Sequence, residues 1–353
     1  MKFSTENHSP VRDACPCCDG NRIRLWMQAS AGIGAHNGRY DLLRCAGCSH
    51  TWVGNPPTPE EMITYYSSEY HEAVGCTGEK TSWRWERQLR VISRFRTGGA
   101  ILDIGCSSGG FLAHLRGGPW QLFGIEASEE SAERARLTTG GQIVSGDVAD
   151  ADLEPNQFDV ITCSDVLEHL YDPRATFDRV SHWLKPGGIF YVFVPNISSW
   201  EARMFGSNWY GLDLPRHLHH FSSESLKTLA ARAGLQTVFV ATPMGCYLEQ
   251  STSEWLNAKL HKVGISHPQV NLSGPAWIGW RALRKALRLT IEAGYARIAS
   301  ACGAAPSLMI VFKKSTSGTS QGIGNKKPAE SASSHDAEAR IQQRAIRLAL
   351  ASK

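Results

Sequence analysis

The feature that most constrains the fold is an alternation of short apolar runs with amphipathic stretches between residues 99 and 244. The apolar runs are bounded by glycine or proline and have the length of buried strands: 100–105, 121–127, 142–146, 158–166, 188–196 and 235–243. Between them, apolar residues recur with helical spacing in stretches such as 128–139, 172–184 and 222–233. Strands that alternate with helices predict an α/β fold built on a parallel sheet with right-handed crossovers.

The first apolar run ends in a glycine-rich turn, Asp103-Ile-Gly-Cys-Ser-Ser-Gly-Gly. Glycine lets the backbone approach a ligand closely, and the start of the following helix offers free N–H groups. A dinucleotide fingerprint needs glycine at the middle position of G-x-G-x-x-G, whereas this chain has Ser107 there. The acid two residues before Gly105 also departs from that fingerprint. The turn therefore allows close approach of a ligand but differs from the dinucleotide pattern.

Acidic residues also stand at the ends of the second and third apolar runs. Glu126 occupies the predicted carboxyl end of a strand, where a carboxylate can accept hydrogen bonds from both hydroxyls of a ribose. Asp147 could accept from an exocyclic amino group, and the Val148 N–H could donate to a ring nitrogen. Open α/β sheets bind ligands at the carboxyl ends of their strands, so we expect these groups to line one edge.

Five motifs follow one another in the chain: LDIGCSSGGFL, GIEAS, SGDVAD, FDVITCSDVLEHLYDP and LKPGGIFYVFVPN. In this order they resemble the motifs of class I S-adenosylmethionine-dependent methyltransferases, over roughly residues 99–244. The resemblance implies a Rossmann-like sheet of seven strands, mostly parallel and flanked by helices. Its last strand, antiparallel to the others, would be the apolar run at 307–314. The alternative is a Rossmann-like domain that binds another nucleotide.

The resemblance also implies that S-adenosylmethionine is the cofactor, and it assigns binding residues. The methionine portion would be held by Asp103, Gly105, Ser107 and Gly109. The ribose would be held by Glu126, the adenine by Asp147 and Val148, and the far side of the cofactor by Ser164. Ser107 departs from the family, which more often has glycine there. We expect it to be tolerated because a small residue can also cap a helix.

Histidines after the fourth and fifth runs are candidate bases. A hydroxyl acceptor usually has to lose its proton during methyl transfer, and histidine suits that step at neutral pH. Glu168 and His169 follow the fourth run, and the resemblance places the loop with His219 and His220 over the acceptor pocket. Each of these could equally be structural, and positioning alone can supply much of the rate. A metal site lacks an evident acidic partner in the sequence, and Arg216 could hold a phosphate or carboxylate of the acceptor.

Five of the ten cysteines fall between residues 15 and 48 and form two C-x-x-C pairs: Cys15 with Cys18, and Cys45 with Cys48. Without a visible secretory segment we expect a cytoplasmic protein with reduced thiols, in which such a cluster favours metal over disulfides. Four thiolates predict a tetrahedral, structural Zn²⁺ site. Cys17 is a fifth thiol that could replace Cys15 or Cys18.

This cysteine segment resembles the N-terminal zinc-binding module of some methyltransferases from sugar and polysaccharide gene clusters. In those relatives the acceptor is often a nucleotide-linked deoxysugar, and the resemblance places Tyr65, Tyr66 and Tyr70 in a lid over the cofactor. The sugar C-methyltransferases carry a larger C-terminal domain than residues 245–313 could form. We therefore favour O- or N-methylation over C-methylation.

The formal net charge of +4 lies entirely in residues 314–353, which hold seven basic and three acidic side chains. The balanced body argues against a nucleic-acid partner. We expect a zinc-binding, zinc-ribbon-like module at 1–55, an aromatic helical linker or lid at 56–98, and the methyltransferase domain at 99–314. That domain would contain an insertion at 245–306, and a flexible basic tail would follow at 315–353. The basic amphipathic stretch that begins at Trp277 could lie on a membrane carrying a lipid-linked acceptor, but packing on the domain is favoured.

These features predict methyl transfer to a small molecule, with a sugar or glycan-pathway intermediate as the leading acceptor. One alternative is methylation of a nucleic acid or protein that the zinc module recognises. Another is a non-catalytic zinc-binding adaptor with a relic cofactor fold, which the presence of both Glu126 and Asp147 argues against.

Overall fold

The computed structural model of the chain describes residues 14–31, 38–66, 82–244 and 294–316, together with a few positions between 247 and 259. Tyr70, the basic stretch that begins at Trp277, most of the predicted insertion and nearly all of the predicted tail lie outside these residues. The proposed division into four segments stays a prediction. None of the described helices has the length and apolarity needed to cross a membrane.

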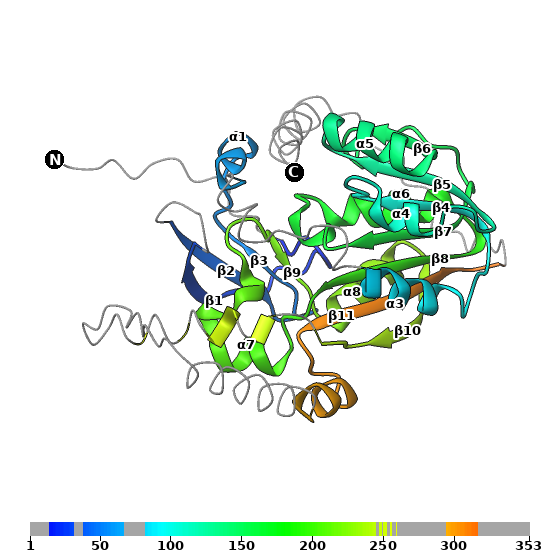
Figure 1. Cartoon of the computed structure of the whole chain (residues 1–353). Helices are drawn as coiled ribbons and strands as arrows, with labels where there is room; N and C mark the ends of the chain where they lie inside the picture. Colours follow the sequence, from blue (N-terminus) through cyan, green and yellow to red (C-terminus); the bar gives the residue numbers. More distant parts are fainter. Residues whose placement is uncertain are drawn as a thin grey trace, which may run out of the picture.

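The larger of two sheets has seven strands in the order β10-β11-β8-β7-β4-β5-β6 (Figure 1). In chain order they are β4 (Gly99–Ile104), β5 (Trp120–Glu126), β6 (Gln142–Ser145), β7 (Phe158–Ser164), β8 (Leu184–Pro195), β10 (Leu235–Ala241) and β11 (Ser307–Lys314). The five neighbouring strands β8, β7, β4, β5 and β6 pair in parallel. Strand β11 is antiparallel to both of its neighbours, β8 and β10. The predicted seven-stranded sheet with an antiparallel last strand is confirmed.

Helices cover both faces of this sheet. The helices are α3 (Ser82–Ile92), α4 (Gly110–His114), α5 (Glu129–Thr139), α6 (Pro173–Trp183) and α8 (Ser223–Arg232). Along β8, Phe190, Val192 and Val194 pack with α6 and α8, while the alternate residues Tyr191 and Phe193 pack with α3, α4 and α5. Successive side chains of a strand point to opposite faces, so a strand buried on both faces is apolar throughout. This burial is why the apolar runs predicted the strands correctly.

The smaller sheet has four antiparallel strands in the order β1-β2-β3-β9. Three come from the cysteine-rich segment: β1 (Ile23–Ser30), β2 (Arg39–Cys45) and β3 (Thr51–Val53). The fourth, β9 (His219–His220), comes from the segment that follows β8 (Figure 1). The cysteine-rich segment therefore shares a sheet with a part of the chain that we predicted to belong to the methyltransferase domain.

Short helical segments connect the two sheets. Near the cysteine-rich segment they are α1 (Pro59–Met62) and η1 (Ile63–Tyr65). After β7 and β8 they are η3 (Leu167–His169), α7 (Trp200–Phe205), η4 (Gly206–Asn208) and η5 (Tyr210–Leu212). A buried cluster formed by Met62, Tyr66 and Leu218 joins these connections, so residues distant in the chain meet beside η3.

Candidate functional site

A cavity opens at the carboxyl ends of β4, β7 and β8, between the glycine turn and α3. Four of the predicted cofactor residues line it: Asp103, Gly105, Ser107 and Ser164. The other four do not line this cavity. Gly109 lies within the turn, and Glu126, Asp147 and Val148 are buried at or just beyond the ends of the neighbouring strands β5 and β6. The cavity thus coincides with the predicted methionine half of the cofactor site, and the predicted ribose and adenine residues continue along the same sheet edge.

The glycine turn depends on left-handed backbone conformations, with φ of 72° at Gly105, 50° at Ser107 and 82° at Gly109. A Cβ at Gly105 would lie 2.3 Å from Cγ2 of Val166, so glycine is required there for space as well as for conformation. The helix begins at Gly110 and its N-cap is Gly109, with no side-chain cap. The expectation that Ser107 caps the helix is wrong, because the turn is still in progress at that residue.

Asp103 is a buried carboxyl that lines the cavity, and the Thr162 hydroxyl donates to its Oδ1 at 2.6 Å. The pKa of Asp103 is raised to about 7, chiefly because burial removes water from the charged form. The Thr162 hydrogen bond lowers the pKa and the nearby charge of Glu126 raises it, both by less than burial does. The cavity therefore contains an acid that changes charge near neutral pH.

Glu126 connects the glycine turn to the start of α5. Its Oε2 accepts from the Ser107 N–H at 2.8 Å, and its Oε1 accepts from the Ser128 N–H at 3.0 Å. These two bonds hold the carboxylate at the carboxyl end of β5. In the next strand, Oδ1 of Asp147 accepts from the Ala149 N–H at 2.8 Å. Each predicted acid is thus held by hydrogen bonds at the end of a different strand.

Helix α3 supplies cavity residues that the sequence reasoning missed. Arg84 forms an ion pair with Asp165, and the Ser164 hydroxyl donates to Oε1 of Gln88 at 3.5 Å. Trp85 packs on the glycine turn, where a Cβ at Gly110 would meet its ring at 2.5 Å. Residues four apart share one helix face, so the spacing of Arg84 and Gln88 was the available signal.

The histidine predicted after β7 meets a different histidine from those proposed. The ring of His169 lies edge-on to that of His217, with centroids 4.7 Å apart. Its Nδ1 is 3.2 Å from the Tyr66 hydroxyl and 3.1 Å from the Arg216 carbonyl oxygen. His217 is 3.0 Å from the Gly211 carbonyl oxygen through Nδ1, which therefore donates. Its Nε2 is left facing the carboxylates beside it.

Two acids flank His217: Oε1 of Glu168 lies 4.0 Å and Oδ2 of Asp213 lies 3.8 Å from its Nε2. Burial raises the pKa of Glu168 well above its usual range and lowers that of His217. Burial opposes the charge of Asp213 too, but His217 and Arg216 outweigh that effect and lower its pKa. Glu168 is therefore neutral at a pH at which Asp213 is charged.

These side chains include the acidic partner that the sequence did not reveal. Ligand-type atoms of Glu168, His169 and His217 all lie within 4.8 Å of one another, a set that could hold a cation. Arg216 is not placed to reach an acceptor phosphate. Its side chain is 1% exposed and pairs with Asp213, so the expectation for this residue is not supported.

The other two proposed histidines lie in the small sheet and do not line the cofactor cavity. His219 Nδ1 is 3.0 Å from Nε2 of His50, which belongs to the cysteine-rich segment. His220 is 2% exposed, its Nε2 has no hydrogen-bond partner, and burial holds its pKa well below the usual value for histidine. His220 still meets the pair, because its ring lies edge-on to that of His217 with centroids 6.5 Å apart, whereas His219 pairs with His50.

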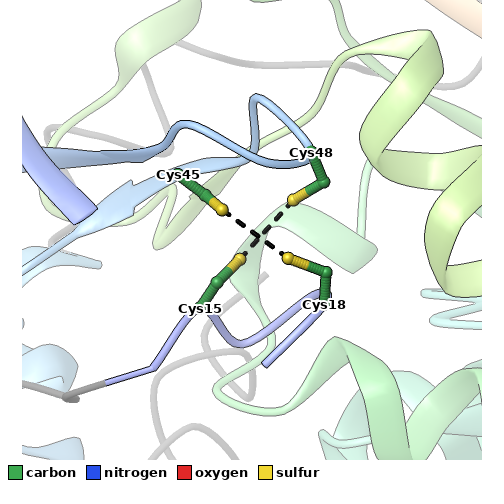
Figure 2. Close-up of side chains that lie close together, drawn as sticks. All are labelled: Cys15, Cys18, Cys45 and Cys48. Atoms are coloured by element: carbon green, nitrogen blue, oxygen red, sulfur yellow. Dashed lines mark hydrogen bonds between the residues drawn. The ribbon is translucent and has the colours of Figure 1, made fainter. Parts of the chain in front are cut away.

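The four predicted cysteine ligands converge on one point (Figure 2). The Sγ atoms of Cys15 and Cys48 are 3.6 Å apart, as are those of Cys18 and Cys45. A tetrahedral zinc with Zn–S bonds of about 2.3 Å would hold its sulfurs about 3.8 Å apart, so the residues fit this ion. Cys17 is not one of the four converging thiols, and its Sγ donates to the Ser225 carbonyl oxygen at 3.1 Å.

Comparison with known proteins adds a family match. Residues 80–240 match the family model described as a methyltransferase domain. The ubiquinone biosynthesis O-methyltransferase of Thiobacillus denitrificans is 30% identical over 152 residues, which are 40% of this chain and 66% of the relative. The protein of the same name from Idiomarina loihiensis is 36% identical over 155 residues, 40% of this chain and 64% of the relative. The chain thus spans just under two thirds of the length of these relatives.

Among solved structures, a SAM dependent methyltransferase from Archaeoglobus fulgidus gives a TM-score of 0.46 at 18% identity. The superposition covers 69% of this chain and 98% of that one.

Proposed function

We propose that this chain, whose residues 80–240 form a class I methyltransferase domain, transfers a methyl group from S-adenosylmethionine to a small-molecule acceptor. One observation carries the proposal: three hydrogen-bonded acids stand at the ends of three neighbouring strands along one sheet edge. Their order along the edge matches the order of ammonium, ribose and adenine in the cofactor. They are Asp103, Glu126 and Asp147.

The cavity residues suit the methionine end of the cofactor, which carries both an ammonium and a carboxylate group. Asp103 and Asp165 can accept from an ammonium, and the guanidinium of Arg84 can hold a carboxylate in a bidentate manner. On binding, the ion pair between Arg84 and Asp165 would open, so that Arg84 pairs with the carboxylate of the ligand and Asp165 with its ammonium group. When bound, S-adenosylmethionine supplies an electrophilic methyl group on a positively charged sulfur.

The histidine cluster supports a proton-accepting role on the acceptor side. His169 is partly exposed and follows the cavity residues Ser164 and Asp165 closely in the chain, at the end of η3. His217 stands against its ring, and the carboxylate of Asp213 beside it offsets part of the effect by which burial lowers the pKa of His217. We assign the base to this pair because His169 is partly exposed, whereas His219 and His220 are both buried.

For the acceptor we propose a sugar or glycan-pathway intermediate, linked to a nucleotide or a lipid, methylated on oxygen or nitrogen. This proposal rests on the likeness of the cysteine module to those of sugar-cluster enzymes and on the fit of its four thiols to zinc. A phenolic hydroxyl is the second candidate, because the relatives named above are ubiquinone biosynthesis O-methyltransferases. Both candidates are small molecules, and both present a hydroxyl.

The test combines calorimetry with a transfer assay on the full-length protein. We expect S-adenosylmethionine to bind, and labelled methyl to reach a nucleoside-diphosphate deoxysugar in preference to a catechol, a transfer RNA or a protein. Absence of cofactor binding would reject the enzyme. Transfer to the catechol alone would replace the sugar by a phenol, and transfer to a polymer would reject the small-molecule acceptor.

The cofactor affinity should depend on pH because of Asp103. A bound ammonium favours the charged carboxylate, so binding below pH 7 must release the proton that the raised pKa retains. We expect the Kd to fall by about tenfold per pH unit up to pH 7 and then to level off. Calorimetry between pH 5.5 and 7.5 measures this slope, and Asp103→Asn should flatten it. A wild-type Kd that does not change over this range would refute the role of Asp103.

The same pKa affects folding without cofactor. Since the folded chain holds this proton up to about pH 7 and the unfolded chain only up to about 3.8, the contribution of Asp103 to stability is lost between these values as pH rises.

Removal of the base should lower turnover without weakening cofactor binding. We expect His169→Ala to reduce kcat by about 10²- to 10⁴-fold, the usual contribution of a general base, and His217→Ala to act in the same direction. The exposed His182 on α6 offers a matched control, because His182→Ala should leave kcat unchanged. Full activity in both cluster variants would leave positioning as the source of catalysis.

A further inference from the structure

The cysteine-rich segment and the histidine segment are joined by a continuous hydrogen-bonded path. Strand β3 pairs with β9, with Trp52 opposite His219. The Val53 N–H donates to the Leu218 carbonyl oxygen at 2.9 Å, and the Leu218 N–H donates to the Glu168 carbonyl oxygen at 2.8 Å. Only backbone bonds therefore separate β3 from the residue that precedes His169.

A stack of buried rings reinforces this path. His50 follows Cys48 by two residues and is fully buried. Its ring stacks on that of His219 with centroids 5.2 Å apart, and the ring of Phe221 lies at the same distance from it. The His50–His219 hydrogen bond, at 3.0 Å, fixes the rotation of both rings. The Cys45 N–H donates to the His50 carbonyl oxygen at 2.9 Å, which ties His50 directly to a metal-ligand turn.

The first cysteine turn is attached to the helices α6 and α8. Cys17 donates to the Ser225 carbonyl oxygen in α8, which begins two residues after Phe221. Asp19 forms ion pairs with Arg174 of α6 and Arg232 of α8. The second cysteine turn leads into β3, which pairs with β9, and the first turn contacts α8, the helix that follows the histidine segment. A metal would join the two turns. In contrast, the residues that line the cofactor cavity all come from 84–193.

We propose that the four-cysteine site positions the histidine segment 217–221, with His50 as the positioning residue between them. Metal bound by the cysteines then keeps His217 in a fixed position against His169. The cofactor cavity forms without this metal. This inference extends the proposed function, because it gives the cysteine module a part in the acceptor side of the site. It requires no knowledge of the acceptor to be tested.

The variant His50→Phe separates positioning from metal binding, because it keeps a ring in the stack, removes the bond to His219 and leaves all four thiols. Hydrogen–deuterium exchange on the full-length, zinc-loaded protein is the measurement. We expect peptides covering 217–221 to exchange about tenfold faster in the variant, the effect of losing one buried hydrogen bond. Zinc content and exchange over 100–105 should not change. Wild type treated with a zinc chelator should show a larger increase over 217–221.

The exposed His182 provides the matched control, since His182→Phe should leave exchange over 217–221 as in wild type. Unchanged exchange over 217–221 in both the His50 variant and the chelated protein would overturn the proposal. An equal increase over 100–105 would also overturn it, because the cysteine site would then support the whole fold. Failure of the proposed function appears separately, as absence of S-adenosylmethionine binding in calorimetry.

Discussion

Replacement of Glu126 by glutamine should weaken S-adenosylmethionine binding by at least a hundredfold. The carboxylate is 6% exposed and already accepts two backbone N–H groups, which fix the direction of its remaining lone pairs. Hydrogen bonds to a charged group contribute about 1.5–3 kcal/mol each, and two ribose hydroxyls would lose such a partner. Since about 1.4 kcal/mol corresponds to a factor of ten, the sum exceeds two orders of magnitude.

Titration calorimetry measures this loss, and Glu129→Gln is the matched control. Glu129 lies three residues away on the surface of α5 and pairs with Arg136, so its replacement should leave the Kd within a factor of about two. A thermal melt of each variant shows whether the fold persists, and Glu126→Asp retains the charge if glutamine disturbs the turn. A change of less than threefold in folded Glu126→Gln would exclude this residue from the ribose site.

Loss of the zinc site should be the largest single effect on stability. Apparent binding free energies of structural zinc are about 10–16 kcal/mol in zinc-finger peptides, comparable to the total stability of many domains. We expect about one zinc per chain, as four thiolates require. The double variant Cys45→Ser, Cys48→Ser should lose it and unfold at least the small sheet. Metal analysis and thermal melting are the measurements.

Two further cysteines make this experiment specific. Cys302 is exposed, so Cys302→Ser should keep both the zinc content and the melting temperature of wild type. Cys17→Ala should also keep the zinc, because its thiol is directed to Ser225. A folded protein without zinc and with an unchanged melting temperature would contradict the four-thiolate site.

The sequence was sufficient for the large sheet because its signals are local. The central strands β4, β7, β8 and β11 are mostly buried and therefore appear as nearly uninterrupted apolar runs. In the crossover helices, apolar residues recur with helical spacing. The acids at the strand ends were equally visible, since Asp103 and Glu126 directly follow or end such runs. The pairing of the four cysteines followed from the C-x-x-C spacing, which brings two thiols to one side of a turn.

The sequence could not reveal contacts between residues that lie far apart in the chain. Strand β9 has only two residues, and its pairing with β3 joins positions more than 160 residues apart, so no local pattern marks it. This pairing buries His219 and His220 and leaves His217 to meet His169. Glu168 was visible as a residue, but its neighbours Asp213 and His217 depend on the same closure.

The place of β11 has a consequence for how the chain folds during synthesis. This strand lies between β8 and β10, although it is translated after both of them. The strands from β4 to β8 can pair as soon as they emerge from the ribosome, whereas β10 has no neighbour in the sheet until residue 314 is made. During that interval β8 presents an open edge, and open edges invite pairing with other chains. A fragment ending at residue 240, where the family match ends, would keep this edge permanently.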